Sequence, residues 1–198
     1  MKQLIADTRK QAKEYGVTIL TPKEDKVYAE GELSGLNGYF DSANKILAVA
    51  TGKPKKDWDK VFIHESCHFD QWLADVYLWN KWNVGYSLFF EWLDSKVELN
   101  RKQLLAAWKD VIDCELDCEK RSIAKIKKYK IPIDTKLYTQ MANSYLYSYT
   151  KLLEVRTWKA GVYLNYDLLQ YSPKVFPKSH LKIPPKLNKA LDEFYSTK

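Results

Sequence analysis

The sequence has few of the residues that cross-link small secreted proteins, since its 198 residues include only three cysteines. An odd, small number of cysteines gives no disulfide framework, so we expect reduced thiols and a cytoplasmic location. Long apolar runs are also missing, because the most apolar stretches, residues 87–93 and 104–108, are far too short to span a bilayer. The first 16 residues lack the continuous apolar segment of a signal peptide. We therefore expect no membrane partner.

Arginine-rich runs and basic arms are absent too, although the net charge is +7. The lysines are spread along the chain and often stand beside acids, as in Lys56-Asp57 and Lys109-Asp110. Such dispersed charge is typical of a solvated basic surface, so a nucleic-acid partner is not expected. The alternative, a basic nucleic-acid-binding domain, would show itself by a steep salt dependence of binding.

Repeats and low-complexity linkers are absent, and 45% of the residues are apolar. The length suits one domain over residues 1–198. Apolar periodicity predicts helices at residues 1–16, 57–77, 86–96, 98–129 and 134–155, with a short one after Pro184-Pro185. Extended segments are predicted at residues 17–21, 26–33 and 38–50, and residues 160–184 should be irregular. The predicted fold class is α+β, with a small N-terminal antiparallel or mixed sheet packed on a mainly helical body.

A short motif stands out inside the second of these helices, where residues 61–72 read VFIHESCHFDQW. Histidines at i and i+4 lie about 40° apart on a helix, so His64 and His68 can reach one ion. Glu65 lies about 100° from the first histidine, where a general base can act on a metal-bound water. Zn²⁺ is the expected ion. Ordinary surface histidines are less consistent with the apolar residues around the motif, because buried imidazoles need partners.

A catalytic zinc usually takes three protein ligands, so a third must come from elsewhere in the chain. His180 lies in the proline-rich segment FPKSHLKIP and is a minor candidate. Within residues 98–129, Glu115 and Glu119 fall in the middle of the apolar face of an amphipathic helix. Buried carboxylates are tolerated when they are paired or bound to metal, so these two glutamates are the better candidates.

The layout of a strand, a short polar loop and an HExxH helix resembles that of zincin metallopeptidases. In those proteins the edge of the strand, here residues 46–50, lies along the cleft, where an extended peptide can pair with it. With ELDCE on a second helix, the chain looks like a gluzincin. This resemblance implies Glu115 as the third ligand and Glu119 as the carboxylate that orients a histidine, with the reverse assignment left open.

Residues 36–160, with HESCHFDQW, ELDCEKR and ANSYLYSY, resemble small metallopeptidases encoded by bacteriophages, which would place the protein in the host cytoplasm. Two departures are visible. The acid that follows the third ligand is usually aspartate and here is Glu119, and the spacing from His68 to Glu115 is longer than in the best-known gluzincins.

Several neighbouring residues have two interpretations. Cys67 and Cys118 are interpreted as packing residues, although zinc accepts thiolates. Gln71 and Asp75 continue the histidine face and are interpreted as a polar rim. Tyr145 is a candidate for polarising the scissile carbonyl, as is His180, against the alternative of core packing.

Together these features predict a zinc-dependent metallopeptidase acting on a peptide or protein substrate. His64, His68 and Glu115 would hold the metal, and Glu65 would be the base. The alternative is a catalytically silent, zinc-stabilised binding protein of a phage or its host, which would have no need of Glu65.

Overall fold

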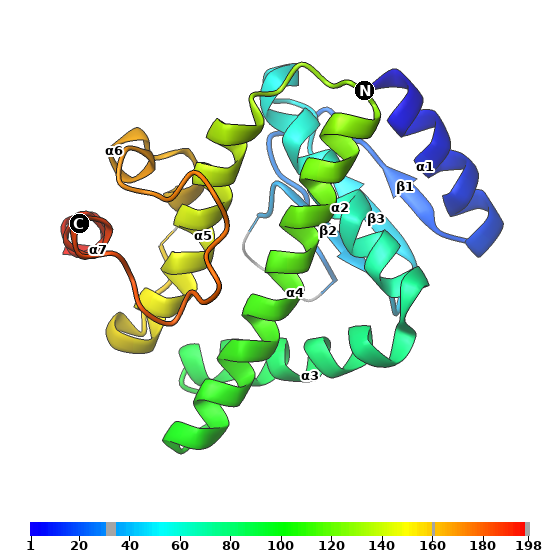
Figure 1. The fold of residues 1–198 in the computed structure, drawn as a ribbon. Helices are drawn as coiled ribbons and strands as arrows, with labels where there is room; N and C mark the ends of the chain where they lie inside the picture. The colour runs from blue at the N-terminus through cyan, green and yellow to red at the C-terminus, as the bar shows by residue number, and fades with distance from the viewer. Residues whose placement is uncertain (31–34, 160, 197–198) are drawn as a thin grey trace. The chain divides into compact units, whose positions relative to one another are not determined.

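The computed structural model describes residues 1–30, 35–159 and 161–196 (Figure 1). Within them a small three-stranded mixed sheet accompanies a mainly helical body, so the α+β fold class is confirmed. The chain divides into two compact units, Met1–Val76 with Lys120–Pro132 and Tyr77–Glu119 with Ile133–Lys198. The single domain over residues 1–198 stays a prediction.

The first unit contains the sheet and the helix that carries the motif. Its elements are α1 (Lys2–Tyr15), β1 (Thr18–Leu20), β2 (Gly38–Asp41), β3 (Ile46–Val49) and α2 (Lys55–Ala74). As predicted, α1 ends at Gly16, whose φ of 71° is the left-handed conformation that glycine adopts most easily.

The strand before the motif lies in the middle of the sheet, whose order is β1-β3-β2. β1 runs parallel to β3, and β2 runs antiparallel to it with Gly38 opposite Val49. The prediction that residues 46–50 offer a free edge to a peptide is therefore wrong, because β3 is paired on both sides. Among the described residues, β2 forms the edge of the sheet on the other side from β1.

Two further strand predictions need correction. Residues 26–33 were expected to be extended, but the described part of this segment forms only an isolated bridge between Val27 and Leu36, and residues 31–34 lie outside the described residues. Residues 38–50 form a hairpin instead of one extended segment. The Asp41 carboxylate accepts hydrogen bonds from the backbone N–H groups of Ala43 and Asn44, at 2.8 and 3.0 Å, and so stabilises the turn.

Helix α2 packs on β2 and β3. Four of its apolar side chains are fully buried: Phe62, Ile63, Cys67 and Phe69. The Phe69 ring contacts that of Phe40 on β2, with centroids 5.4 Å apart. This apolar packing fixes the rotation of α2 about its axis, and with it the direction of the two histidines.

Most of the second unit is helical. It draws on α3 (Val76–Leu93), most of α4 (Arg101–Lys128), α5 (Thr135–Val155), the 3₁₀ turn η1 (Val162–Leu164), α6 (Tyr166–Leu169) and α7 (Pro185–Ser196). The helices predicted at residues 98–129, at 134–155 and after Pro184-Pro185 are thus confirmed. Residues 161–184 are largely irregular as expected, apart from η1 and α6.

The boundary between α2 and α3 was predicted wrongly. The predicted helix 57–77 ends at Ala74, because Asp75 adopts an extended backbone with φ −155°. The predicted helix 86–96 begins as early as Val76 and ends at Leu93. The first turns of α3 carry Trp79 and Trp82 on their buried side, while Tyr77 is 83% exposed. Such apolar residues on both faces obscure the helical period.

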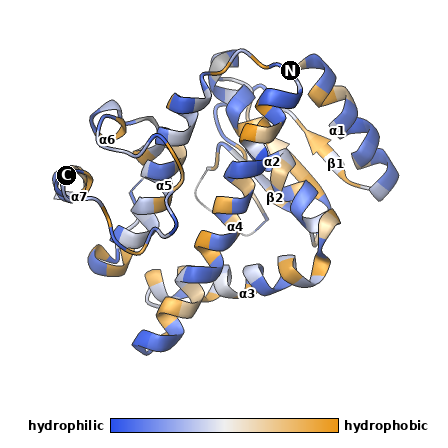
Figure 2. Cartoon of the chain, viewed as in Figure 1, coloured by the Kyte–Doolittle hydropathy of each residue, from blue (hydrophilic) through white to orange (hydrophobic). Residues whose placement is uncertain are grey.

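Helix α4 is amphipathic, with apolar and hydrophilic residues alternating along it (Figure 2). In the second unit its apolar face packs with α3 and α5 through a core that includes Phe89, Trp108, Val111, Leu146 and Tyr149. No helix in the described ranges is both long and apolar enough to cross a membrane.

Candidate metal centre

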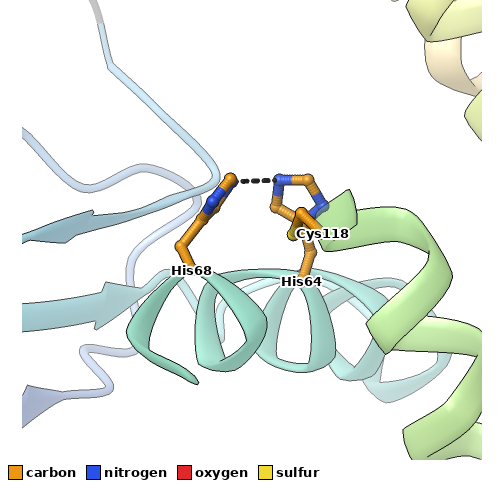
Figure 3. Close-up of side chains that lie close together, drawn as sticks. All are labelled: His64, His68 and Cys118. Carbon is orange, nitrogen blue, oxygen red and sulfur yellow. Dashed lines mark hydrogen bonds between the residues drawn. The ribbon is translucent and has the colours of Figure 1, made fainter. Parts of the chain in front are cut away.

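Two imidazoles lie one helical turn apart on α2 and face each other (Figure 3). The Nε2 atoms of His64 and His68 are 3.0 Å apart, and the rings meet edge to face with centroids 4.6 Å apart. His68 is 8% exposed, and His64 is partly buried. This pair confirms that the i, i+4 spacing brings both side chains to one point.

The tautomer of His68 is set by Gln71. The Oε1 atom of Gln71 lies 2.8 Å from Nδ1 of His68, and a carbonyl oxygen can only accept, so Nδ1 carries the proton. The lone pair of His68 is therefore on Nε2, the atom that faces His64. A metal-binding histidine commonly has such a partner for its other ring nitrogen.

His68 is also held in its neutral form. Burial lowers its pKa, the nearby His64 lowers it further, and the Gln71 hydrogen bond opposes the shift, with a resulting pKa of about 3. Near neutral pH the ring is uncharged, which is the form that binds a metal.

A thiol joins the two imidazoles. Ligand atoms of His64, His68 and Cys118, the last from α4, all lie within 4.8 Å of one another (Figure 3). Cys118 is fully buried. Within the described ranges this is the group of His, Cys, Asp and Glu side chains that can hold a metal ion. Cys118 is thus a candidate ligand, whereas the sequence pattern favours a packing role for it over metal binding.

The packing interpretation fits Cys67 better. Its Sγ atom accepts a hydrogen bond from the Ser122 hydroxyl at 3.5 Å, and both residues are fully buried. One turn further along α4, the Lys125 ammonium donates to the Ser66 hydroxyl and pairs with Asp70, each at 2.8 Å. These contacts fasten the last turns of α4 to α2 within the first unit.

The expected base, Glu65, is 8% exposed and lies against the edge strand. A Cβ atom placed on Gly38 of β2 would come within 3.0 Å of Cγ of Glu65 and 2.6 Å of Cγ1 of Val61. Only a glycine fits between this strand and α2. The backbone of β2 therefore runs directly past the stem of Glu65.

The two glutamates of α4 are buried, as the apolar stripe predicted: Glu115 is 4% exposed and Glu119 is fully buried. Neither belongs to the group of ligand atoms around His64, His68 and Cys118 in the described part of the chain. Within the second unit, Glu115 lies near enough to Tyr149 to contribute to the raised pKa of its hydroxyl, after the larger effects of burial, Tyr145 and Tyr86. The ligand role of Glu115 and the orienting role of Glu119 stay predictions.

The two candidates for polarising a carbonyl are both engaged in the second unit. The Tyr145 hydroxyl lies 2.6 Å from that of Tyr149. His180 is 1% exposed, with Nε2 3.0 Å from Oδ1 of Asn143 and its ring 4.8 Å from that of Tyr147. These contacts explain the burial of His180. A catalytic role for Tyr145 stays a prediction.

Sequence reasoning gave too little weight to Gln71. Its place three residues after His68 on the histidine face was visible, but a polar rim was the preferred interpretation. Gln71 is 2% exposed, so it belongs to the buried part of the site. Asp75 is exposed and lies just beyond the end of α2, so the helical face that carries the histidines does not continue to it.

Comparisons of this chain with protein-family models, curated proteins and solved structures give no match.

Proposed function

We propose that this protein is a zinc-dependent hydrolase of the metallopeptidase type, which cleaves peptide bonds. The observation that carries the proposal is the histidine pair of α2, with its two Nε2 atoms 3.0 Å apart and the tautomer of His68 fixed by Gln71. His68 is buried and neutral, and a metal ion on its Nε2 atom would complete the polar contacts of a ring that has left solvent.

The donor set fits zinc. Two imidazoles and a thiolate are nitrogen and sulfur donors, which suit Zn²⁺ and do not suit Mg²⁺ or Ca²⁺. His64 and His68 would supply two ligands. The third would come from α4, where the grouping of Cys118 with the histidines supports the thiol and the gluzincin resemblance supports Glu115.

The proposed catalytic activity depends on Glu65. A bound zinc would supply the Lewis acidity that brings the pKa of a water to about 7. Glu65, next to His64 and largely buried, would accept a proton from that water and deliver it to the leaving amine. Gln71 would keep the lone pair of His68 on Nε2 throughout.

The edge strand supports a peptide as the substrate. β2 has no strand beyond it among the described residues, and Gly38 on β2 lies against Glu65. An extended peptide that added to this edge would therefore run past the base. In this proposal the substrate pairs with β2 instead of the strand that the sequence layout suggested.

A zinc-stabilised binding protein is the second candidate, and the thiol of Cys118 is what favours it. Sulfur ligands are common in structural zinc sites, which are closed by four protein ligands and need no base. A peptidase needs the Glu65 carboxylate for its activity, whereas a zinc-stabilised binding protein does not need it.

The decisive experiment measures zinc content and hydrolysis of a peptide library for the wild type, Glu65→Gln and His64→Ala. We expect Glu65→Gln to keep its zinc and to lose activity by at least about 100-fold, since a general base contributes roughly 10²–10⁴. His64→Ala should lose both. A wild type that holds zinc without hydrolysing any peptide would support the binding protein, and one that takes up no zinc after reconstitution would refute both candidates.

The third ligand is identified by zinc affinity in Cys118→Ser, Glu115→Gln and Glu119→Gln. Cys114→Ser is the matched control, because Cys114 lies one turn earlier on α4, is 6% exposed and is not part of the group. The ligand is the residue whose replacement weakens zinc binding while the control does not.

A further inference from the structure

A basic segment of the second unit runs from the end of α6 into α7. This segment, residues 168–191, contains five lysines but no aspartate, glutamate or arginine. Elsewhere in the chain lysines often stand beside acids, so the charge of this segment is an exception. All five lysines are exposed: Lys174, Lys178, Lys182, Lys186 and Lys189.

Most of this charge is not neutralised by the protein itself. Lys189 pairs with Glu193 on α7 at 4.0 Å, and the other carboxylate there, Asp192, pairs with Lys151 at 2.6 Å. Within the described part of the chain, the remaining four lysines of the basic segment form no ion pair. Four positive charges are therefore available to an external partner.

The backbone of the basic segment is fastened to α5, beside which it runs (Figure 1). The Asn143 amide nitrogen donates hydrogen bonds to the carbonyl oxygens of Pro173 and Val175, at 2.8 and 3.0 Å. Its Oδ1 atom lies 3.0 Å from Nε2 of the buried His180, and the Thr150 hydroxyl donates to the His180 carbonyl oxygen at 2.8 Å. These contacts hold an irregular backbone in one conformation.

Two aliphatic side chains project from this fastened backbone into solvent. Val175 is 72% exposed and Leu181 is 52% exposed. They lie near each other, because the Val175 carbonyl and the His180 ring bind the same Asn143 amide. Lys174 and Lys182 stand next to them in the sequence. Single exposed aliphatic residues are common, but here two of them lie among four lysines that have no carboxylate partner.

We propose that the basic segment docks on the surface of an anionic lipid bilayer. Val175 and Leu181 would enter the boundary between headgroups and acyl chains, while the ammonium groups would meet the lipid phosphates. Such a contact needs no segment that crosses the bilayer, which was the basis on which a membrane partner was not expected. It is independent of the proposed hydrolase activity.

Nucleic acid, the other extended array of phosphates, fits this surface less well. The basic segment has no arginine for bidentate contacts to phosphates or bases. Val175 and Leu181 would also gain little against a phosphate backbone, whereas a bilayer offers them an apolar phase. The combination of lysines with aliphatic side chains therefore favours the bilayer.

Co-sedimentation of the full chain with lipid vesicles tests this proposal. Phosphatidylcholine vesicles with about one-third phosphatidylglycerol should bind the protein at about 0.15 M salt, and vesicles of phosphatidylcholine alone should bind it at least about 10-fold more weakly. Duplex DNA at the same phosphate concentration should not displace the protein from the anionic vesicles. Absence of binding at millimolar anionic lipid, equal binding to both kinds of vesicle, or displacement by DNA would overturn the proposal.

Variants locate the contact. The double change Val175→Ser and Leu181→Ser keeps the backbone bonds to α5 and should weaken binding to anionic vesicles at least about 10-fold, since two aliphatic side chains no longer enter the bilayer. Lys178→Gln should weaken it about fivefold, the share of one lysine near an anionic surface. The matched controls are Val84→Ser on α3, where Val84 is 62% exposed, and Lys102→Gln on α4, where Lys102 is exposed. Both controls should change binding less than about twofold. Unchanged binding in the double variant, or equal losses in the controls, would refute the proposed surface.

Discussion

Replacing Gln71 by leucine should weaken zinc binding without removing any metal ligand. Gln71 is 2% exposed, and it accepts the Nδ1 proton of His68 across 2.8 Å. Leucine has a similar volume and cannot accept a hydrogen bond. His68 would then keep a buried N–H group without this partner, which costs about 1–3 kcal/mol, or it would move the proton to Nε2 and lose its metal-binding lone pair.

The size of the effect follows from these two responses. Loss of a partner that orients a metal-binding histidine typically lowers affinity about 10–100-fold, which corresponds to roughly 1.4–2.7 kcal/mol. We therefore expect the Kd for zinc to rise by this factor in Gln71→Leu. The assay is competition with a chromophoric chelator at pH 7, with folding checked by circular dichroism.

Gln71→Glu is the matched control. A carboxylate accepts the same proton and strengthens the hydrogen bond, so zinc affinity should equal or exceed that of the wild type. A Gln71→Leu protein that folds and binds zinc with unchanged affinity would refute the argument that Gln71 prepares His68 for a metal.

Two further predictions concern the packing of the first unit and its response to pH. Gly38→Ala should lower the free energy of unfolding by about 1–3 kcal/mol, because the new methyl group would lie 2.6 Å from Cγ1 of Val61 and 2.9 Å from the Ala48 carbonyl oxygen. Urea titration of Gly38→Ala with and without Val61→Ala tests this, and the two changes should be non-additive because Val61→Ala removes the closest of these atoms; strict additivity would contradict the predicted contact. In the metal-free protein, the pKa of His68 is about 3 in the folded state against about 6.5 in the unfolded state, so below pH 6.5 the unfolded chain binds the extra proton. Stability should therefore fall as the pH drops from 6.5 towards 3, by up to about 1.4 kcal/mol per pH unit, and His68→Asn should flatten this dependence between pH 4 and 6.5; an unchanged slope in the variant would show that other groups produce it.

Local features of this protein could be predicted from its sequence to a useful degree. The facing imidazoles of His64 and His68 follow from helical periodicity alone, and the burial of Glu115 and Glu119 follows from their place in an apolar stripe. The end of α1 follows from Gly16. Each of these depends only on residues within a few turns of one another.

Features that depend on distant parts of the chain could not be predicted in this way. Pairing order in the sheet depends on how three short strands meet, so the position of β3 between β1 and β2 was not visible in its composition. The grouping of Cys118 with the histidines depends on the packing of α4, about fifty residues further along the chain. The early start of α3 was hidden because its exposed face carries apolar residues such as Tyr77.

The first unit is assembled from two separate stretches of the chain, and this fixes an order of events during synthesis. Residues 1–76 leave the ribosome before residues 120–132, which include Ser122 and Lys125 and their contacts with α2. At a synthesis rate of roughly 5–20 residues per second, that second stretch is completed several seconds after the helix with the histidines. Until then, His64 and His68 are the members of the proposed ligand set that have been synthesised. Binding of an ion by the complete proposed ligand set would thus be a late step, which follows the synthesis of α4.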